Sequence, residues 1–309
     1  MSAGSAPIRF GLIGVDSPHA PSFTSLFGDG IDGAVPGGTV THAWKGEAAA
    51  DFPLSFERID GFEQQVIDLG VSMCASPEEV AQVCDALLIV ASDTRTHRAY
   101  FDRVVGFGKP IYVDTRFATT LDDARSMLAA AQASGALVLA GSPKRFTPEF
   151  ASAVAAGPAE RISLTGPLPT QPGHPGLAWY GVHLVDLAVT ALGADTDLAG
   201  AVIESSRDEA GGRTRVTIRC VDGRVIDLGG EDQWSAFTAG VLERADSNAE
   251  FSIEAGPPML VGLLEGLVAS CLGGTPNVPP ADILGIVAIV QAANQSLDTG
   301  RPVSLGSLT

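Results

Sequence analysis

Short apolar runs alternate with segments of helical periodicity over the first half of the chain. The runs predict strands at residues 8–14, 39–44, 71–74, 86–91, 111–114 and 136–140. Helices are predicted between them at residues 18–27, 57–69, 77–84, 98–107 and 121–133. This alternation is typical of parallel strands joined by crossover helices. We therefore expect an α/β, Rossmann-like doubly wound sheet, with ligands at the carboxyl ends of its strands.

The pattern changes after about residue 146, where several runs alternate polar and apolar residues. Strands are predicted at residues 161–165, 201–205, 213–221, 224–228, 233–242 and 250–254, and helices at 179–192, 257–272 and 281–297. Asp222-Gly223 predicts a hairpin turn. Residues 166–178 are rich in Pro and Gly and predict a long loop, a common place for a substrate lid. The two patterns predict a Rossmann-like domain over residues 1–145 and an α+β domain, with a mostly antiparallel sheet, over 146–309.

Composition agrees with two folded domains and narrows the choice of partners. The chain has 309 residues, 45% of them hydrophobic, and domains average roughly 150 residues. With 19 basic and 36 acidic residues the formal charge is −17, which opposes binding to nucleic acid or to an anionic membrane. Only three of the basic residues are lysines: Lys45, Lys109 and Lys144. Any function that needs a catalytic ammonium group therefore has few candidates.

Targeting and redox features are sparse. The N-terminus lacks the cationic start and apolar core of a secretory signal, and no apolar run approaches the roughly 20 residues that span a bilayer. We expect a cytoplasmic protein. The four cysteines show no C-x-x-C pair and are expected to be reduced thiols, most of them buried. No His, Cys and carboxylate set has the spacing of metal ligands, so no metal site is predicted.

The turn after the first strand matches a dinucleotide-binding turn only in part. Gly14 supplies the first glycine of G-x-G-x-x-G, but Asp16 and His19 occupy the positions of the other two. Asp16 or Ser17 before Pro18 also makes a good helix cap, and a carboxylate there would occupy or repel the anion site. The turn is therefore compatible with a modified cofactor site and equally with a strand-to-helix turn that binds no nucleotide.

Two further segments could contact a dinucleotide. Lys45 ends the second strand, where it could favour the 2′-phosphate of NADP or be a solvated lysine. Ser92, Thr94 and His97 follow the fourth strand, where hydroxyls at a helix start suit ribose or phosphate contacts. Thr94 or Thr96 could also be a helix N-cap.

Five segments together resemble the glucose-fructose oxidoreductase / inositol dehydrogenase / MocA (Gfo/Idh/MocA) family over most of the chain. In order, they read G-L-I-G-V-D-S-P-H-A, A-L-L-I-V-A-S-D-T-R-T-H-R, G-K-P-I-Y-V-D-T-R-F, K-R-F-T-P-E and Y-G-V-H-L-V-D-L-A-V-T-A-L-G. The resemblance implies an NAD(P)-dependent dehydrogenase of sugars, cyclitols or related small alcohols. It also implies a Rossmann domain and an α+β domain whose sheet often builds oligomers, so a homodimer or homotetramer is expected.

The chain departs from the family pattern at its catalytic positions. The resemblance places a family lysine, which positions substrate and relays its proton, at Thr115 within Asp114-Thr115-Arg116. Asp114 and Thr115 remain candidates for cofactor contacts. Threonine does not titrate usefully and arginine stays protonated, so neither replaces that lysine as an acid or base. Arg116 could still hold a carboxylate or an oxyanion.

The family histidine corresponds to His183, with Asp186 one turn along the same helix face. The aspartate that many members carry four residues before this histidine is Trp179 here. His183 is the best general acid/base candidate because its ordinary pKa lies near neutrality. Taken alone, a histidine on an apolar helix is equally a structural residue.

Four other residues are candidates for the substrate site. Lys144 follows the sixth strand and could supply the missing ammonium, or bind an acidic substrate with Arg145; the alternative is a surface lysine beside a structural arginine. Tyr180 could present its phenol to substrate or pack in the core. His174 lies in the Pro/Gly loop and is a lid candidate.

These observations leave three functions to weigh. The first is an NAD(P)-dependent oxidoreductase with a divergent site that lacks the family lysine. The second is a non-redox acid/base enzyme, catalysing elimination, epimerisation or hydrolysis on the same scaffold. The third is a non-catalytic ligand-binding protein. The expected partner is a small-molecule substrate in each case.

Overall fold

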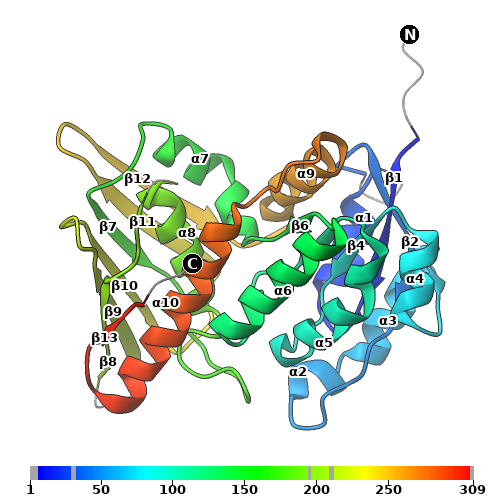
Figure 1. Cartoon of the computed structure of the whole chain (residues 1–309), viewed down its shortest axis with the longest axis horizontal. Coiled ribbons are helices and arrows are strands. Elements are labelled where there is room, and N and C mark those ends of the chain that lie inside the picture. Colours follow the sequence, from blue (N-terminus) through cyan, green and yellow to red (C-terminus); the bar gives the residue numbers. More distant parts are fainter. Residues whose placement is uncertain (1–5, 29–32, 194–195, 209–211, 307–309) are drawn as a thin grey trace. The chain divides into compact units, whose positions relative to one another are not determined.

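The computed structural model describes residues 6–28, 33–193, 196–208 and 212–306 (Figure 1). The first five residues, part of the segment in which the sequence shows no secretory signal, lie outside this description. The chain forms two units. The first contains Met1–Ala118, Arg125–Ala140 and Leu260–Val278, and the second contains Thr119–Ala124, Gly141–Met259 and Pro279–Thr309.

A six-stranded parallel sheet with the order β3-β2-β1-β4-β5-β6 forms the centre of the first unit. Its strands are β1 (Ile8–Ile13), β2 (Gly38–Trp44), β3 (Ser72–Met73), β4 (Ala86–Ile89), β5 (Ile111–Val113) and β6 (Val138–Leu139). Every residue of β4 and β5 is buried, as expected for strands covered on both faces. The strand order reverses between β1 and β4, which confirms the doubly wound Rossmann-like sheet.

Helices join these strands in the predicted places, with two differences. They are α1 (His19–Leu26), α2 (Pro53–Phe56), α3 (Ile59–Asp68), α4 (Pro77–Val83), α5 (Thr94–Val104), α6 (Leu121–Ser134) and the 3-10 turn η1 (Val105–Phe107). The short α2 has no counterpart in the prediction. Helix α5 begins four residues early because the Asp93 carboxylate caps it, accepting the Arg95 N–H at 3.0 Å. The prediction of Thr94 or Thr96 as the N-cap is therefore wrong.

The second unit contains a seven-stranded sheet with the order β12-β11-β7-β10-β9-β8-β13. Its strands are β7 (Arg161–Thr165), β8 (Val202–Arg207), β9 (Arg213–Arg219), β10 (Val225–Glu231), β11 (Phe237–Glu243), β12 (Asn248–Glu254) and β13 (Val303–Ser304). All pairings are antiparallel except that of β7 with β10. The mostly antiparallel α+β sheet is thus confirmed. Gly223, at φ +92°, turns β9 into β10 as the predicted hairpin.

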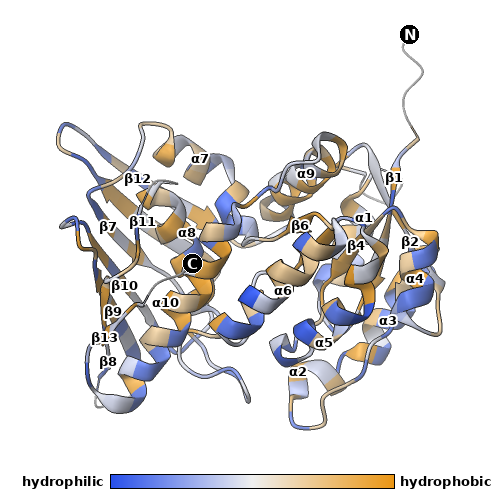
Figure 2. Ribbon diagram, viewed as in Figure 1, coloured by the Kyte–Doolittle hydropathy of each residue, from blue (hydrophilic) through white to orange (hydrophobic). Residues whose placement is uncertain are grey.

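Helices cover one face of this second sheet. They are the 3-10 turn η2 (Pro143–Phe146), α7 (Pro148–Val154), α8 (Gly181–Leu192) and α10 (Pro280–Thr299). Alternate strand residues such as Ile162, Leu164, Ile226 and Leu228 join the buried side of α8 in one apolar core. Figure 2 shows α10 carrying both hydrophobic and hydrophilic residues, and its hydrophobic residues are mostly buried. The loop over residues 166–178 contains no helix or strand, as predicted.

The chain passes between the units more often than the single boundary at residue 145 predicts. Residues 260–278, which include most of α9 (Pro257–Gly273), group with the first unit, where Val268 lies beside Gly37. Asn277 then brackets the backbone of Ala140, accepting its N–H at 3.0 Å and donating to its carbonyl at 2.8 Å. Residues far apart in sequence therefore complete the edge of the parallel sheet.

No helix in the described ranges combines the length and apolarity needed to span a bilayer. All four cysteines are free thiols: Cys84 and Cys220 are buried, whereas Cys74 and Cys271 are partly exposed. The thiols are thus free as expected, but only half of them are buried.

Candidate functional site

The turn from β1 into α1 lies at the carboxyl edge of the parallel sheet. Gly14 has φ +79°, and a Cβ there would come within 2.8 Å of the Ala91 Cβ, so only glycine fits this position. The Ser17 hydroxyl accepts the His19 N–H at 3.2 Å, and the Ser17 carbonyl accepts the Ala20 N–H at 3.0 Å. The N-cap of α1 is Pro18, which has no side-chain cap bond, so the prediction of Asp16 or Ser17 as the cap is wrong. Pro18 and Pro21 have no N–H. The first helical turn therefore donates its amide groups within the chain.

Asp16 joins this turn to the turn after β4. It is 3% exposed, and its Oδ1 accepts the Ser92 N–H at 2.8 Å, while the Ser92 hydroxyl donates to the Asp16 carbonyl at 3.0 Å. Arg58, which directly precedes α3, donates from Nη2 to the same carbonyl at 3.4 Å and to the Ser92 hydroxyl at 3.2 Å. Burial raises the pKa of Asp16, opposed by hydrogen bonds from the Ser55 hydroxyl and the Ser92 N–H.

Asp114 and His19 connect the end of β5 to the start of α1. The Nδ1 atom of His19 lies 2.9 Å from Asp114 Oδ2, and the other carboxylate oxygen accepts the Tyr112 hydroxyl and the Thr115 N–H, each at 2.9 Å. Although burial opposes it, the His19 imidazole holds the pKa of Asp114 well below its usual range. Arg116, partly exposed, adds a positive charge nearby.

His97 and Lys45 take part in contacts within the first unit. The fully buried His97 places Nε2 2.8 Å from the Ala91 carbonyl, and burial lowers its pKa. The Lys45 ammonium forms ion pairs of 2.6 Å with Asp60 and 2.7 Å with Glu63, both on α3. The Lys45 charge is thus compensated by the carboxylates of one helix.

A doubly wound parallel sheet of this kind commonly binds a dinucleotide. The hydrogen-bond donors at its carboxyl edge determine how a dinucleotide would be held. The amides of the first turn of α1, which usually hold a pyrophosphate, are engaged, and Asp16 stands where the second glycine would lie. The same edge nevertheless carries hydroxyl groups on Ser17 and Ser92 and the guanidinium of Arg58. These residues fit a dinucleotide that is held by side chains more than by helix amides.

The turn η2 is the centre of the polar cluster in the second unit. The buried Ser142 precedes it, and its hydroxyl lies 2.7 Å from His183 Nδ1, on α8. The Ser142 N–H donates to Asp186 Oδ2 at 2.6 Å. His183 and Asp186 therefore face the same turn, in agreement with the predicted common helix face, and Ser142 connects them.

Asp186 and Arg145 form a buried ion network with Asp282 of α10. Arg145 donates to Asp186 Oδ1 at 3.0 Å and to Asp282 Oδ2 at 2.6 Å. Burial raises the pKa of the Asp186 carboxyl, and the Arg145 charge opposes that rise. These contacts support the interpretation of Arg145 as a structural arginine.

Lys144, next to Arg145, has a different environment. Its side chain is buried, and its ammonium donates to the hydroxyl of Thr238 on β11. Its backbone N–H donates to the Ser142 hydroxyl at 3.3 Å, and the same hydroxyl is hydrogen-bonded to His183 Nδ1. Burial lowers the pKa of Lys144 to about 8. The alternative of a surface lysine is thus wrong.

Aromatic side chains surround His183. The Tyr180 ring packs on the His183 ring with centroids 5.5 Å apart, and its hydroxyl accepts the Trp234 indole N–H at 3.1 Å. Trp234, which precedes β11, is 61% exposed. The buried His174 packs edge-on against Trp179 at 5.3 Å, and its Nδ1 lies 3.1 Å from the Pro172 carbonyl. His174 is therefore fixed inside its own loop.

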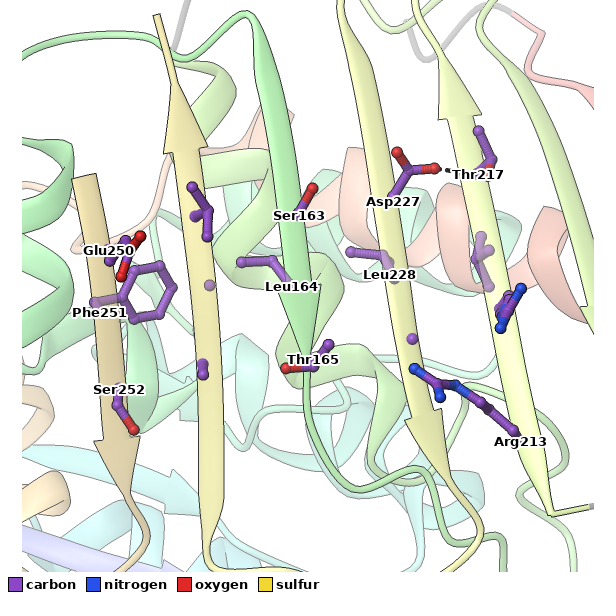
Figure 3. A pocket seen from close by; sticks show the side chains of 16 residues that line it. Ser163, Leu164, Thr165, Arg213, Thr217, Asp227, Leu228, Glu250, Phe251 and Ser252 are labelled. Carbon is purple, nitrogen blue, oxygen red and sulfur yellow. Dashed lines mark hydrogen bonds between the residues drawn. The ribbon is translucent and has the colours of Figure 1, made fainter. Parts of the chain in front are cut away.

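A hollow of about 730 Å³ lies elsewhere, on the face of the second sheet (Figure 3). It is lined by residues of β7, β9, β10, β11 and β12, among them Ser163, Asp227 and Arg213. No residue predicted as a site residue lines it. The homo-oligomer expected from the sequence stays a prediction.

The described part of the chain contains no cluster of three or more His, Cys, Asp or Glu that could hold a metal ion. Several residues of the two polar clusters were not among the predicted site residues, among them Ser142, Thr238 and Arg58. A serine at the end of the sixth predicted strand was a weak signal for the first. Nothing local in the sequence distinguishes the other two, because their partners lie far away in the chain.

A six-stranded doubly wound parallel sheet and a seven-stranded mostly antiparallel sheet together make the two-domain fold of the Gfo/Idh/MocA proteins. GenD2 from gentamicin A biosynthesis, solved in complex with NAD, is similar over 99% of both chains, with a TM-score of 0.79 and 15% identity. A myo-inositol dehydrogenase from Corynebacterium glutamicum is similar over 98% of this chain and 100% of its own, with a TM-score of 0.76 and 17% identity.

An oxidoreductase from Agrobacterium radiobacter, solved with NAD+, L-tartaric acid and magnesium, is similar over 97% of this chain and 98% of its own. Its TM-score is 0.73 and its identity 14%. No family model and no curated protein matches the sequence. At these identities the likeness establishes the fold that the sequence resemblance implied.

Proposed function

We propose that the chain is an NAD(P)-dependent oxidoreductase that acts on a sugar, a cyclitol or a related small hydroxy compound. The observation that carries the proposal is the Ser142–His183 hydrogen bond beside the buried Lys144, on a fold shared with NAD-bound oxidoreductases. The His183 imidazole on α8 and the Lys144 amine on η2, whose pKa is about 8, suit proton transfer near neutral pH.

Residues of the first unit would hold the cofactor and those of the second would move the proton. Gly14, Ser17, Ser92 and Arg58 are the proposed contacts of the dinucleotide, whose nicotinamide, when bound, accepts a hydride from the carbinol carbon. His183 is the proposed acceptor of the substrate hydroxyl proton. In the tautomer whose Nδ1–H donates to the Ser142 hydroxyl, Nε2 would be the proton acceptor. Lys144, whose backbone N–H donates to the Ser142 hydroxyl and whose ammonium donates to Thr238, would supply a positive charge.

The substrate class rests on the structural neighbours and on the aromatic side chains. Neighbours include myo-inositol dehydrogenases and a UDP-N-acetylglucosamine 3-dehydrogenase. Trp234 and Tyr180 present a partly exposed aromatic pair next to His183. Such faces pack well against the C–H groups of a polyhydroxylated ring.

His183→Gln tests the proton-transfer role. Loss of a general acid/base typically lowers turnover about 10²–10⁴-fold, and we expect the reduction of NAD(P) with a panel of polyols and sugars to fall by that factor. His42→Gln is the matched control, because His42 lies on β2 and contacts Thr41 at 3.0 Å. Equal activity of His183→Gln and the natural protein would remove the proposed role.

Asp16 favours a second candidate function, a non-redox acid/base enzyme. Asp16 occupies the position of the second glycine of a dinucleotide-binding turn, where its charge would oppose a pyrophosphate, while the His183 cluster keeps groups able to transfer a proton. Turnover without any nicotinamide nucleotide, abolished by His183→Gln, would establish this alternative over the first.

A further inference from the structure

Asp16, Ser92 and Arg58 meet at the place where the order of the parallel sheet reverses. Asp16 follows β1 and Ser92 follows β4, and these two strands are neighbours although β2 and β3 separate them in sequence. In doubly wound sheets this reversal opens the crevice that takes a ligand. The groups that meet at this reversal are a carboxylate, a hydroxyl and a guanidinium.

The usual anchor for a phosphate at this place is not available in its usual form. The N–H groups of His19 and Ala20 donate to Ser17, and Pro18 and Pro21 have none. A helix start normally offers such amides to an anion. A pyrophosphate placed here would therefore need another donor.

Asp16 adds a repulsive charge to this deficit. Its carboxylate is buried and lies 2.8 Å from the Ser92 N–H, so it uses a backbone donor of the second turn as well. Two anions that share hydrogen-bond donors lie close together, and they repel each other strongly in a partly buried site. The negative charge of Asp16 should therefore weaken the binding of any second anion beside it.

Arg58 provides the compensating positive charge. Its Nε donates to the Leu54 carbonyl at 2.6 Å, and its Nη2 reaches both turns through the Asp16 carbonyl and the Ser92 hydroxyl. The side chain is half-buried, and its guanidinium also lies over the Phe62 ring, 5.5 Å from the ring centroid. A planar guanidinium is the side chain best suited to bind phosphate oxygens in pairs.

We propose that Arg58 anchors the pyrophosphate of the dinucleotide and that Asp16 limits the affinity of the protein for the dinucleotide, an inference that rests on the proposed cofactor. The chain would thus have replaced an anchor made of helix amides by a side-chain cation. The two residues then act with opposite sign on the same ligand. A purely structural role for both would instead make the two substitutions act in the same direction.

Calorimetric titration of the full chain with NADH and with ADP-ribose tests this. Arg58→Gln should lower the affinity for both ligands at least about tenfold, the size expected for the loss of a charge-assisted contact. Arg58→Lys should recover part of the loss. Arg95→Gln is the matched control: Arg95 lies in the same unit and pairs with Asp51 and Asp93, and its loss should leave affinity unchanged.

Asp16→Asn completes the test, because asparagine keeps an oxygen for the Ser92 N–H and loses the charge. Affinity should rise about tenfold, by the same reasoning with the sign reversed. Equal losses in Arg58→Gln and Arg95→Gln, or a weaker Asp16→Asn, would overturn the inference. Thermal melting of each variant shows whether it is folded.

The results also separate this inference from the proposed function. If the natural protein binds NADH and neither substitution changes the affinity, the inference fails and the cofactor proposal stands. If only Asp16→Asn binds, the inference is supported and the natural chain is not NAD(P)-dependent. If neither protein binds either ligand, both proposals fail.

Discussion

At the carboxyl edge of the parallel sheet, buried polar groups are bonded mainly to one another, whereas the turn η2 of the second unit holds a buried ammonium bonded to a hydroxyl. Asp114 has a histidine and two further donors, and Asp16 has a backbone N–H with a guanidinium nearby. Lys144, among the described residues, bonds its ammonium to Thr238 and to no carboxylate. The first arrangement holds charge in place, and the second suits the transfer of a proton.

The same contrast exists within η2 itself. Arg145 lies between two carboxylates, while its neighbour Lys144 pairs with none in the described ranges. Burial therefore disfavours the charged form of Lys144, and the network of Arg145 keeps its own charge. Arg145 therefore fixes the turn on α8 and α10, whereas Lys144 has a pKa of about 8, close to neutral pH.

The largest expected effect is the loss of the network that fixes the turn. Asp186→Asn leaves Arg145 with one carboxylate, and breaking a buried pair costs roughly 3–5 kcal/mol. We expect a loss of about 3 kcal/mol in the free energy of unfolding, measured with urea, since Asp282 remains. Glu204→Gln, which breaks an exposed pair with Arg219, serves as the control. An unchanged stability would contradict the description of η2 as held by Asp186.

Lys144→Met should have the opposite sign. Because burial lowers the pKa of Lys144 from 10.5 to about 8, the folded protein binds fewer protons than the unfolded chain between these values. Stability therefore rises with pH across this window, and the full cost, about 3 kcal/mol, applies below it. At neutral pH the methionine variant should be more stable by up to that amount.

The methionine variant should also lose the rise in stability between pH 8 and 10.5. Unfolding curves at several pH values check both statements. Lys45→Met, at a partly exposed ion pair, is the control and should keep the rise. A destabilised Lys144→Met protein at pH 7 would show that the ammonium is held by favourable contacts instead.

The smallest effect concerns the edge of the first unit. Asp93→Ala removes the N-cap of α5, which typically costs about 1 kcal/mol. Asp102→Ala breaks only an exposed i,i+4 pair with Arg98 and should cost no more than about 0.5 kcal/mol. Thermal unfolding of the two variants compares the cap with the pair. A larger loss for Asp102→Ala would mean that the start of α5 does not depend on Asp93.

The sequence predicts the regular elements well and the polar clusters only partly. Apolar runs place all six parallel strands, and the fully buried β4 and β5 follow the clearest of these runs, although β3 and β6 are only two residues long. Short elements such as α2, α7 and β13 have too few residues to show a period. His183 and Lys144 were found through their chemistry and the family resemblance.

Ser142 and Arg58 were not predicted as site residues because their hydrogen-bond partners lie far away in the sequence. The hydroxyl of Ser142 meets a residue 41 positions away, and Arg58 meets Ser92 34 positions away. A local pattern holds no signal for contacts of that separation. The boundary between the units was equally hidden, since residues 260–278 return to the first unit only in three dimensions.

The bracketing of Ala140 by Asn277 has a consequence for how the protein is made. The parallel sheet cannot gain this edge partner until the ribosome has synthesised nearly the whole chain, because 137 residues separate the two. During synthesis the backbone of Ala140 therefore lacks its two hydrogen bonds to Asn277 while the strands of the antiparallel sheet emerge. A fragment that stops at residue 145 would lack residues 260–278, which group with the first unit.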